Sequence, residues 1–205
     1  MKQIILIGGA PTAGKSTLAR KLAGDLQFPW ISTDTIREQM RKLVRREDYP
    51  ALFQHADATA EMGVEFLNHN TAEKIVHHQN TESLDVQKGV RALIETDYVW
   101  DSFIIEGIAI LPAFAREMMS AHTGIQTVFL IDENQERIRD AIFTRGLWDD
   151  ADKYPDAVKE KEVRWVLAFN QRLIEEAARY GLPVVKIGDR DACLEEIKRM
   201  LKSGT

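Results

Sequence analysis

The chain has 205 residues, of which 44% are hydrophobic and 29% charged, a composition typical of one globular domain with a single sizeable core. Its formal net charge of −5 argues against a general binder of nucleic acid or of anionic membranes, because phosphate groups demand concentrated Lys and Arg. The single cysteine, Cys193, rules out an internal disulfide, and no apolar stretch is long enough to span a membrane. We therefore expect a cytoplasmic protein.

The order of the predicted elements indicates a parallel sheet covered by helices. Short runs rich in Ile and Val, typical of strands buried on both faces, alternate with longer amphipathic segments. Five of these runs are predicted to be strands, at residues 4–7, 30–31, 103–105, 127–131 and 184–187.

Apolar periodicity predicts the helices between these strands. Leu18, Leu22 and Leu26 recur every four residues after the first strand, and a helix that contains Ile36 and Met40 follows the second. The other predicted helices are two or three inserted within residues 51–97, a long one over 156–180 and a last one around 194–201.

The segment after the first strand matches the phosphate-binding pattern G-x-x-x-x-G-K-[ST] without a mismatch. Its glycines let the backbone curl around an anion, and the helix behind it adds the positive end of its dipole. Lys15 is expected to reach the β- and γ-phosphates of ATP, and Ser16 to bind Mg²⁺. The predicted nucleotide-binding residues are Gly9, Ala10, Pro11, Thr12, Ala13, Gly14, Lys15, Ser16 and Thr17.

Together, the elements and this motif predict an α/β fold of the P-loop NTPase kind. We expect a five-stranded parallel sheet in the order 2-3-1-4-5, with helices on both faces. Residues 1–205 are expected to form a single kinase domain, with a helical acceptor-binding insertion at about 47–99 and a lid at about 144–156.

Asp34 and Arg37 follow the second strand and are the predicted catalytic pair. Ligands bind at the carboxyl ends of the strands in open α/β sheets, where Asp34 can take the proton from an attacking hydroxyl or orient it. Arg37, one helical turn further on, can hold an anionic part of the acceptor. The other interpretation is that Asp34 only caps a helix, but Thr35 and Glu38 match a capping box of their own, which leaves Asp34 free.

Arg37, Arg41 and Arg45 recur at i, i+4 and i+8 along the same predicted helix. For Arg41 and Arg45, a solvated helix face is the favoured interpretation. If the stripe lines the site instead, the acceptor is negatively charged.

Glu106 ends the third strand, which the expected strand order places beside the P-loop strand. We expect Glu106 to hold Mg²⁺ through water or to position the acceptor, and Gly107 to permit a close approach. The alternative is a plain carboxylate at a strand end.

The predicted lid is a polar loop after the fourth strand, punctuated by Gly and Pro. Phosphoryl transfer has to exclude water, and arginines that close over the phosphates stabilise the shifting charge. At least one of Arg137, Arg139 and Arg145 is expected to act in this way, with Arg139 at the nucleotide and Arg145 in catalysis; a surface role is the alternative for each. Trp148 is either a mobile contact or an anchor of the lid. No role is assigned to the histidines His55, His69, His77, His78 and His122.

Missing signatures narrow the function. An N-K-x-D segment, which a GTPase needs, and an L-S-G-G-Q-like segment, which transporter ATPases carry, are both absent. The sequence therefore predicts a kinase that uses ATP and Mg²⁺ to phosphorylate a small molecule. Two alternatives stay open: a kinase for a nucleotide, a polynucleotide 5′ end or a sugar nucleotide, and an ATP-dependent regulatory protein. The oligomeric state is not predicted.

Two segments, at residues 33–41 and 104–112, resemble 2-phosphoglycerate kinase and related small P-loop kinases, which pair T-D-x-I-R-E-x-M-R with an I-I-E-G-x-H-like strand end. The resemblance implies a nucleoside-monophosphate-kinase-like fold, ATP and Mg²⁺ as cosubstrates, and a small anionic acceptor. The Asp34 and Arg37 pair also looks like the catalytic pair of polynucleotide kinases. Departures from the pattern are Ala109 where the family's histidine is expected, Ala113 where a glycine often stands, and a segment around 54–57 that lacks a serine-tyrosine run.

Overall fold

A computed structural model describes residues 3–96, 101–148 and 150–203. Residues 97–99 of the predicted insertion and residue 149 of the predicted lid lie outside this part. Within it, five strands form one parallel sheet in the order β2-β3-β1-β4-β5, which confirms the predicted order. The strands are β1 (Gln3–Gly9), β2 (Trp30–Ser32), β3 (Ser102–Glu106), β4 (Ile125–Ile131) and β5 (Val184–Lys186).

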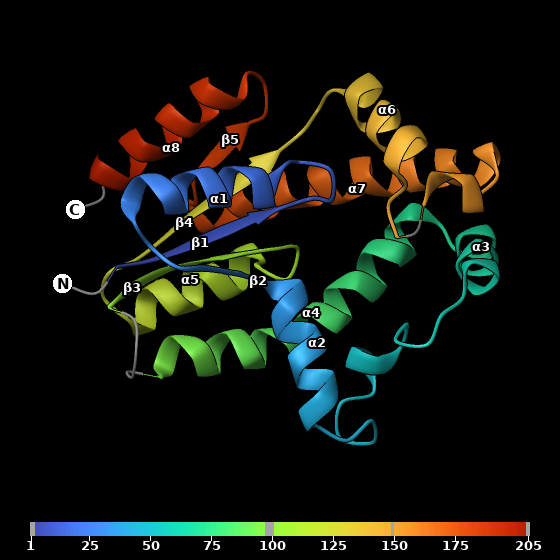
Figure 1. Cartoon of the computed structure of the whole chain (residues 1–205), viewed down its shortest axis with the longest axis horizontal. Helices are drawn as coiled ribbons and strands as arrows, with labels where there is room; N and C mark the ends of the chain where they lie inside the picture. Colours follow the sequence, from blue (N-terminus) through green and yellow to red (C-terminus); the bar gives the residue numbers. More distant parts are fainter. Residues whose placement is uncertain (1–2, 97–100, 149, 204–205) are drawn as a thin grey trace.

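Helices cover both faces of the sheet because alternate side chains of each central strand point to opposite faces. In β1, Ile4 and Leu6 pack into one core, whereas Ile5 and Ile7 pack into the other. The second core is closed by α1 (Lys15–Leu26) and α8 (Arg190–Ser203) (Figure 1). The first and larger core is closed by helices α4 (Ala72–Glu95), α5 (Pro112–Ala121) and α7 (Asp156–Tyr180).

The segment between β2 and β3 is helical, as its periodicity predicts. It consists of α2 (Thr33–Leu43), the short 3₁₀ helix η1 (Ala51–Phe53), α3 (Ala60–His69) and the long helix α4. Thr59 and Thr71 cap α3 and α4, since each hydroxyl accepts a hydrogen bond from the amide three residues further on. Figure 1 shows α2 and α3 standing away from the sheet, while α4 runs back towards it.

A second projecting segment follows β4. It comprises α6 (Gln135–Arg145), a turn that begins at Gly146 with φ +82°, and the 3₁₀ helix η2 (Ala151–Lys153). Helix α6 packs against α7, and α3 also contacts α7. The insertion and the predicted lid therefore flank the same end of α7, beyond the carboxyl ends of the strands (Figure 1). None of the described helices combines the length and the apolar character that crossing a bilayer requires.

Candidate functional site

The P-loop connects β1 to α1 and has the backbone of an anion cradle. Gly9 has φ +153°, and a Cβ there would lie 2.6 Å from the carbonyl oxygen of Leu130. Gly14, the N-cap of α1, has φ +75°, and a Cβ there would meet no heavy atom within 4 Å. No side chain caps α1, so its first amides remain directed at the space in front of the loop. Thr12 also has a positive φ, of 66°, which is uncommon outside functional turns.

Lys15 lies at the centre of the charged groups of the site. Its Nζ donates a hydrogen bond to the carbonyl oxygen of Ala10 at 2.8 Å. Burial lowers the pKa of its ammonium from the usual value, Glu106 and Asp34 oppose this shift, and Arg145 adds to it. The structure thus brings Lys15, Glu106, Asp34 and Arg145 within electrostatic reach of one another.

Glu106 is the last residue of β3 and pairs in register with Ile7 of β1, directly before the P-loop. Its side chain is 2% exposed, and burial raises the pKa of its carboxyl, although Lys15 and a hydrogen bond with Ser16 work in the other direction. Its Oε1 has no hydrogen-bond partner among the described residues. A buried carboxylate oxygen without a partner is costly unless a ligand or ion completes its shell.

Asp34 lies in the first turn of α2 and does not cap the helix. Ser32 is the N-cap of α2, and its hydroxyl accepts a hydrogen bond from the Thr35 amide at 3.1 Å. The predicted capping box of Thr35 and Glu38 is therefore wrong, because α2 begins three residues earlier than that box requires. Asp34 is free to pair with Arg37, at 3.2 Å from its Nη1, and its carboxylate is 66% exposed towards the cavity.

The expectation that Arg41 lies on a solvated helix face is wrong. Only 12% of its side chain is exposed, and its guanidinium bonds to Glu38, to Glu82 and to the carbonyl oxygen of Leu52. Glu82 comes from α4, 41 residues away, and is 6% exposed. Burial raises the pKa of Glu82, whereas Arg37 and Arg41 counteract this effect. Sequence reasoning missed Glu82 because only the folded chain brings α4 beside α2.

The solvated interpretation is confirmed for Arg45. Its side chain is 78% exposed and pairs with Asp48 at 2.8 Å, at i and i+3. Arg46 is also largely exposed and pairs with Asp57.

The three lid arginines occupy different environments. Arg145 ends α6 and acts electrostatically on Lys15. Arg139 is bound to Glu160 of α7 at 2.7 Å and is not among the residues that line the cavity described below. Arg137 makes two hydrogen bonds of 2.7 Å to the buried carboxylate of Asp132, at the end of β4. This geometry fits an anchor between α6 and the sheet.

A cavity of about 650 Å³ lies between the P-loop, the insertion and the predicted lid. Its polar lining residues include Lys15, Ser16, Asp34, Arg37, Arg41, Gln79, Glu82 and Glu106, and its apolar and aromatic ones include Met62, Phe66, Ile75, Leu147, Trp148, Tyr154 and Trp165. Most of the predicted catalytic residues therefore meet in one cavity, to which Arg145 adds its charge from the margin.

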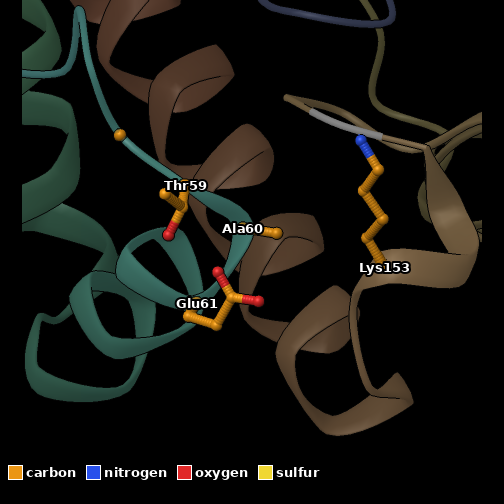
Figure 2. Close-up of a pocket in the computed structure, with 5 residues that line it drawn as sticks. Thr59, Ala60, Glu61 and Lys153 are labelled. Carbon is orange, nitrogen blue, oxygen red and sulfur yellow. The ribbon is translucent and has the colours of Figure 1, made fainter.

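Figure 2 shows an adjoining hollow of about 510 Å³, with Thr59, Ala60 and Glu61 of the start of α3 on one side and Lys153 of η2 on the other. Thr59 also lines the main cavity, so the hollow lies at the edge of that cavity, between the insertion and the lid.

Aromatic rings from several elements form a connected group in the lining of the cavity. Trp148 lies 5.2 Å from Trp165 of α7 and 6.3 Å from Phe66 of α3, measured between ring centroids. Phe66 contacts His55 and His78 edge-on, at 4.9 and 5.4 Å. Trp148 therefore contacts both α3 and α7 from the lid. His55 and His78 carried no signal in the sequence, because their spacing matches no metal or catalytic pattern.

Comparison with known proteins identifies a matching family model and several named relatives. A family model described as an AAA domain matches residues 4–95. The chain is 30% identical over 206 residues to a 2-phosphoglycerate kinase of Methanocaldococcus jannaschii, with 98% of this chain and 64% of the relative aligned. It is 31% identical over 211 residues to a 2-phosphoglycerate kinase of Methanothermobacter thermautotrophicus, with 98% and 66% aligned. The chain thus spans slightly less than two thirds of these relatives' length. The resemblance expected from two motifs is confirmed and runs along nearly the whole chain.

The fold is also found among solved structures. Shikimate kinase from Bacteroides thetaiotaomicron aligns with a TM-score of 0.52 at 17% identity, over 98% of this chain and 99% of that chain. At this identity the comparison shows the fold, which is that of a small P-loop kinase.

Proposed function

We infer that the chain is an ATP-dependent kinase that transfers the γ-phosphoryl group to a hydroxyl or phosphate of a small anionic molecule. The observation that carries this proposal is the meeting of Lys15, Glu106, Asp34 and Arg37 in one cavity. A nucleotide switch needs a phosphate cradle, but it does not need a carboxylate and an arginine aimed at a second substrate. The similarity to relatives named 2-phosphoglycerate kinase makes 2-phosphoglycerate the first acceptor to test. A cytoplasmic location is part of this proposal.

The P-loop supplies the nucleotide half of the reaction. Its amides and the N-terminus of α1 bind the phosphates, and Lys15 exchanges the Ala10 carbonyl oxygen for the β- and γ-phosphate oxygens. Burial lowers the pKa of the Lys15 ammonium. The negative charge of the incoming phosphates acts in the other direction and favours its protonated form. Arg145, at the end of α6, adds a second positive charge where the transferred group is most negative.

Mg²⁺ fits beside Ser16 and Glu106. The orphaned Oε1 of Glu106 is a hard oxygen donor within a buried setting, and Ser16 adds a hydroxyl at the start of α1. When bound there, Mg²⁺ neutralises charge on the nucleotide phosphates. The raised pKa of Glu106 is then expected to fall, because a divalent cation favours the carboxylate form.

The role assigned to Asp34 in this proposal is to act on the acceptor. In the proposed reaction the acceptor oxygen attacks the γ-phosphorus, the proton of an acceptor hydroxyl passes to Asp34, and ADP leaves. Arg37, 3.2 Å from Asp34, fixes that carboxylate and holds an anionic group of the acceptor. Asp34 is more exposed than Glu106, so its carboxylate is the more accessible of the two to an acceptor in the cavity.

Transfer of label from γ-³²P-ATP to 2-phosphoglycerate and to other anionic acceptors tests the proposal. Asp34→Asn should reduce transfer at least about 100-fold while Mg-ATP affinity stays unchanged, because only the proton acceptor is lost. Asp48→Asn is the matched control, since Asp48 forms the same i, i+3 pair with Arg45 on the exposed side. Lys15→Ala should abolish nucleotide binding. Slow ATP hydrolysis that no acceptor accelerates would instead identify a regulatory protein.

A further inference from the structure

Two histidines of the insertion line the cavity and have no part in the proposed phosphoryl transfer. His55 follows η1, and His78 lies on α4. Nδ1 of His78 is hydrogen-bonded to the side-chain amide of Gln54 at 2.8 Å, and Gln54 lines the cavity too. Phe66 of α3 lies edge-on to both imidazoles, with ring centroids 4.9 Å from His55 and 5.4 Å from His78. The two imidazoles therefore belong to one corner of the cavity.

Arg41 joins the two segments that carry these histidines. Its Nε donates a hydrogen bond at 2.7 Å to the carbonyl oxygen of Leu52 in η1, shortly before His55. Its Nη2 donates at 2.9 Å to Glu82, which lies one turn after His78 on the same face of α4. Because these bonds hold η1 against α4, the two imidazoles are held in place by the fold.

The charges that reach His55 are positive. Its side chain is open to the cavity, but desolvation by the surrounding protein lowers its pKa, and His78 and Arg41 lower it further. These two groups come from α4 and α2, whereas α3 presents the uncharged ring of Phe66. Among the described residues, no carboxylate opposes this shift.

The carboxylates that line the described cavity act elsewhere. Asp34 and Glu106 act on Lys15, and Glu82 is paired with Arg41 at 2.9 Å. An anionic group that enters the corner would therefore meet two imidazoles without having to displace a carboxylate from them. Such an anion also favours the protonated form of a nearby imidazole.

The corner lies next to the arginine that is proposed to hold the acceptor. Arg37 stands one turn before Arg41 on α2, and its Nη1 is 4.0 Å from the same Glu82 carboxylate that binds Arg41. An acceptor held at Arg37, beside Asp34, therefore has the imidazole corner as a neighbour.

We propose that His55 and His78 form a second anion-binding point of the acceptor site, beside Arg37, and that they bind the acceptor in their protonated forms. This inference rests on the proposed kinase function and adds the residues that recognise a second anionic group. An acceptor with two such groups, such as 2-phosphoglycerate, can place one at Arg37 and the other at the imidazoles. The Gln54 amide suits both states of His78, because it donates to a neutral Nδ1 and, turned over, accepts from a protonated one.

Proton linkage gives this binding point a pH signature. The bound anion raises the proton affinity of the imidazoles, so the complex holds protons that the free protein has released. Affinity for the acceptor therefore falls as the pH rises through the range in which histidine titrates. The phosphate group of 2-phosphoglycerate titrates as well, at a pKa of about 6, but this effect is the same for every variant and cancels in the ratio of their dissociation constants.

Equilibrium binding of 2-phosphoglycerate to the full chain, with Mg²⁺ and a non-hydrolysable ATP analogue present, tests the inference. His55→Gln and His78→Gln should each weaken binding about fivefold at about pH 6.5, and less than about twofold at about pH 8.5, where the native imidazoles are neutral. His69→Gln is the matched control and should change neither value. His69 is exposed at the end of α3, bonds to the carbonyl oxygen of Glu65 and does not line the cavity.

His55→Lys provides a test in the opposite direction, because it fixes a positive charge that persists at about pH 8.5. The variant should bind 2-phosphoglycerate about fivefold more tightly than the native chain at about pH 8.5, a gain that a purely structural role of the ring would not give. Parallel pH curves for the native chain and both Gln variants, no gain with His55→Lys, or no binding of 2-phosphoglycerate beside the bound analogue overturns the inference. Failure of the ATP analogue itself to bind overturns the proposed kinase function as well, so the two failures can be told apart.

Discussion

Glu162 gives a sharp test of how burial sets the charge state of a group in this fold. It lies on α7 one turn before Trp165, is completely buried, and neither of its carboxyl oxygens has a hydrogen-bond partner among the described residues. Burial raises its pKa from 4.5 to about 7, and the nearby Lys159 offsets only part of this shift. Glu162 is therefore neutral in the folded protein at pH values at which it is ionised in the unfolded chain.

The sign of the resulting pH dependence follows from proton linkage. Between about pH 4.5 and pH 7 the folded state holds a proton that the unfolded state has released, so stability falls as the pH rises through this window. Each pH unit of pKa shift corresponds to about 1.4 kcal/mol, which sets an upper limit of about 3 kcal/mol. A buried carboxylate draws in water when it ionises, so we expect about 2 kcal/mol to be realised between about pH 5 and pH 8.5.

Glu162→Gln removes this dependence while keeping the shape of the side chain. Urea unfolding should give free energies within about 1 kcal/mol of each other for the two proteins at about pH 5, and a variant that is about 2 kcal/mol more stable at about pH 8.5. Glu160→Gln is the control, because it removes the same charge from the same helix at a solvent-accessible position. Parallel stability–pH curves for the native protein and Glu162→Gln would refute the reasoning.

Two further predictions concern the backbone and the α6 anchor. Gly107→Ala should lower the free energy of unfolding by about 3 kcal/mol, because the new Cβ would lie 1.8 Å from the Thr33 Oγ1 at a residue with φ +153°. The control Gly24→Ala, in α1 with open space around the new Cβ, should raise it by about 1 kcal/mol in the same urea titration. Arg137→Ala should destabilise by about 2 kcal/mol, since Asp132 is 1% exposed and would lose both hydrogen bonds from the Arg137 guanidinium; an unchanged urea midpoint would show that the pair contributes nothing.

The parts of the site that could be predicted from the sequence are those that local chemistry determines. The P-loop spacing fixes a turn with positive φ at Gly14, and the strand that precedes it and the helix that follows are encoded within a few residues. Glu106 could be placed for a similar reason, because a carboxylate at the end of a buried parallel strand reaches the same edge of the sheet as the P-loop. Single helices such as α7 were also predictable, since their apolar period is uninterrupted.

The parts that could not be predicted depend on contacts between distant segments. Arg41 has the sequence context of a solvated residue, and only the packing of α4 against α2 supplies Glu82 and buries the pair. Glu38 was misread for a local reason: Ser32 caps α2, so the Glu38 carboxylate bonds to Arg37 and Arg41 instead of closing a capping box. A pattern at i, i+4 defines a helix face, but it does not say what covers that face.

The same distinction separates the chemistry of the cavity from its selectivity. The groups proposed to act on the phosphates come from the carboxyl ends of β1 and β3 and from the first turn of α2, and their geometry depends on the sheet. Phe66 and Trp148 come from the insertion and the lid, which contact α7 but add no strand to the sheet. Because contacts to a distant part of a substrate contribute binding energy separately from the reacting atoms, these rings can change without disturbing phosphoryl transfer. Similarity along the whole chain is therefore strong support for the reaction class and much weaker support for the acceptor, which a direct transfer assay has to identify.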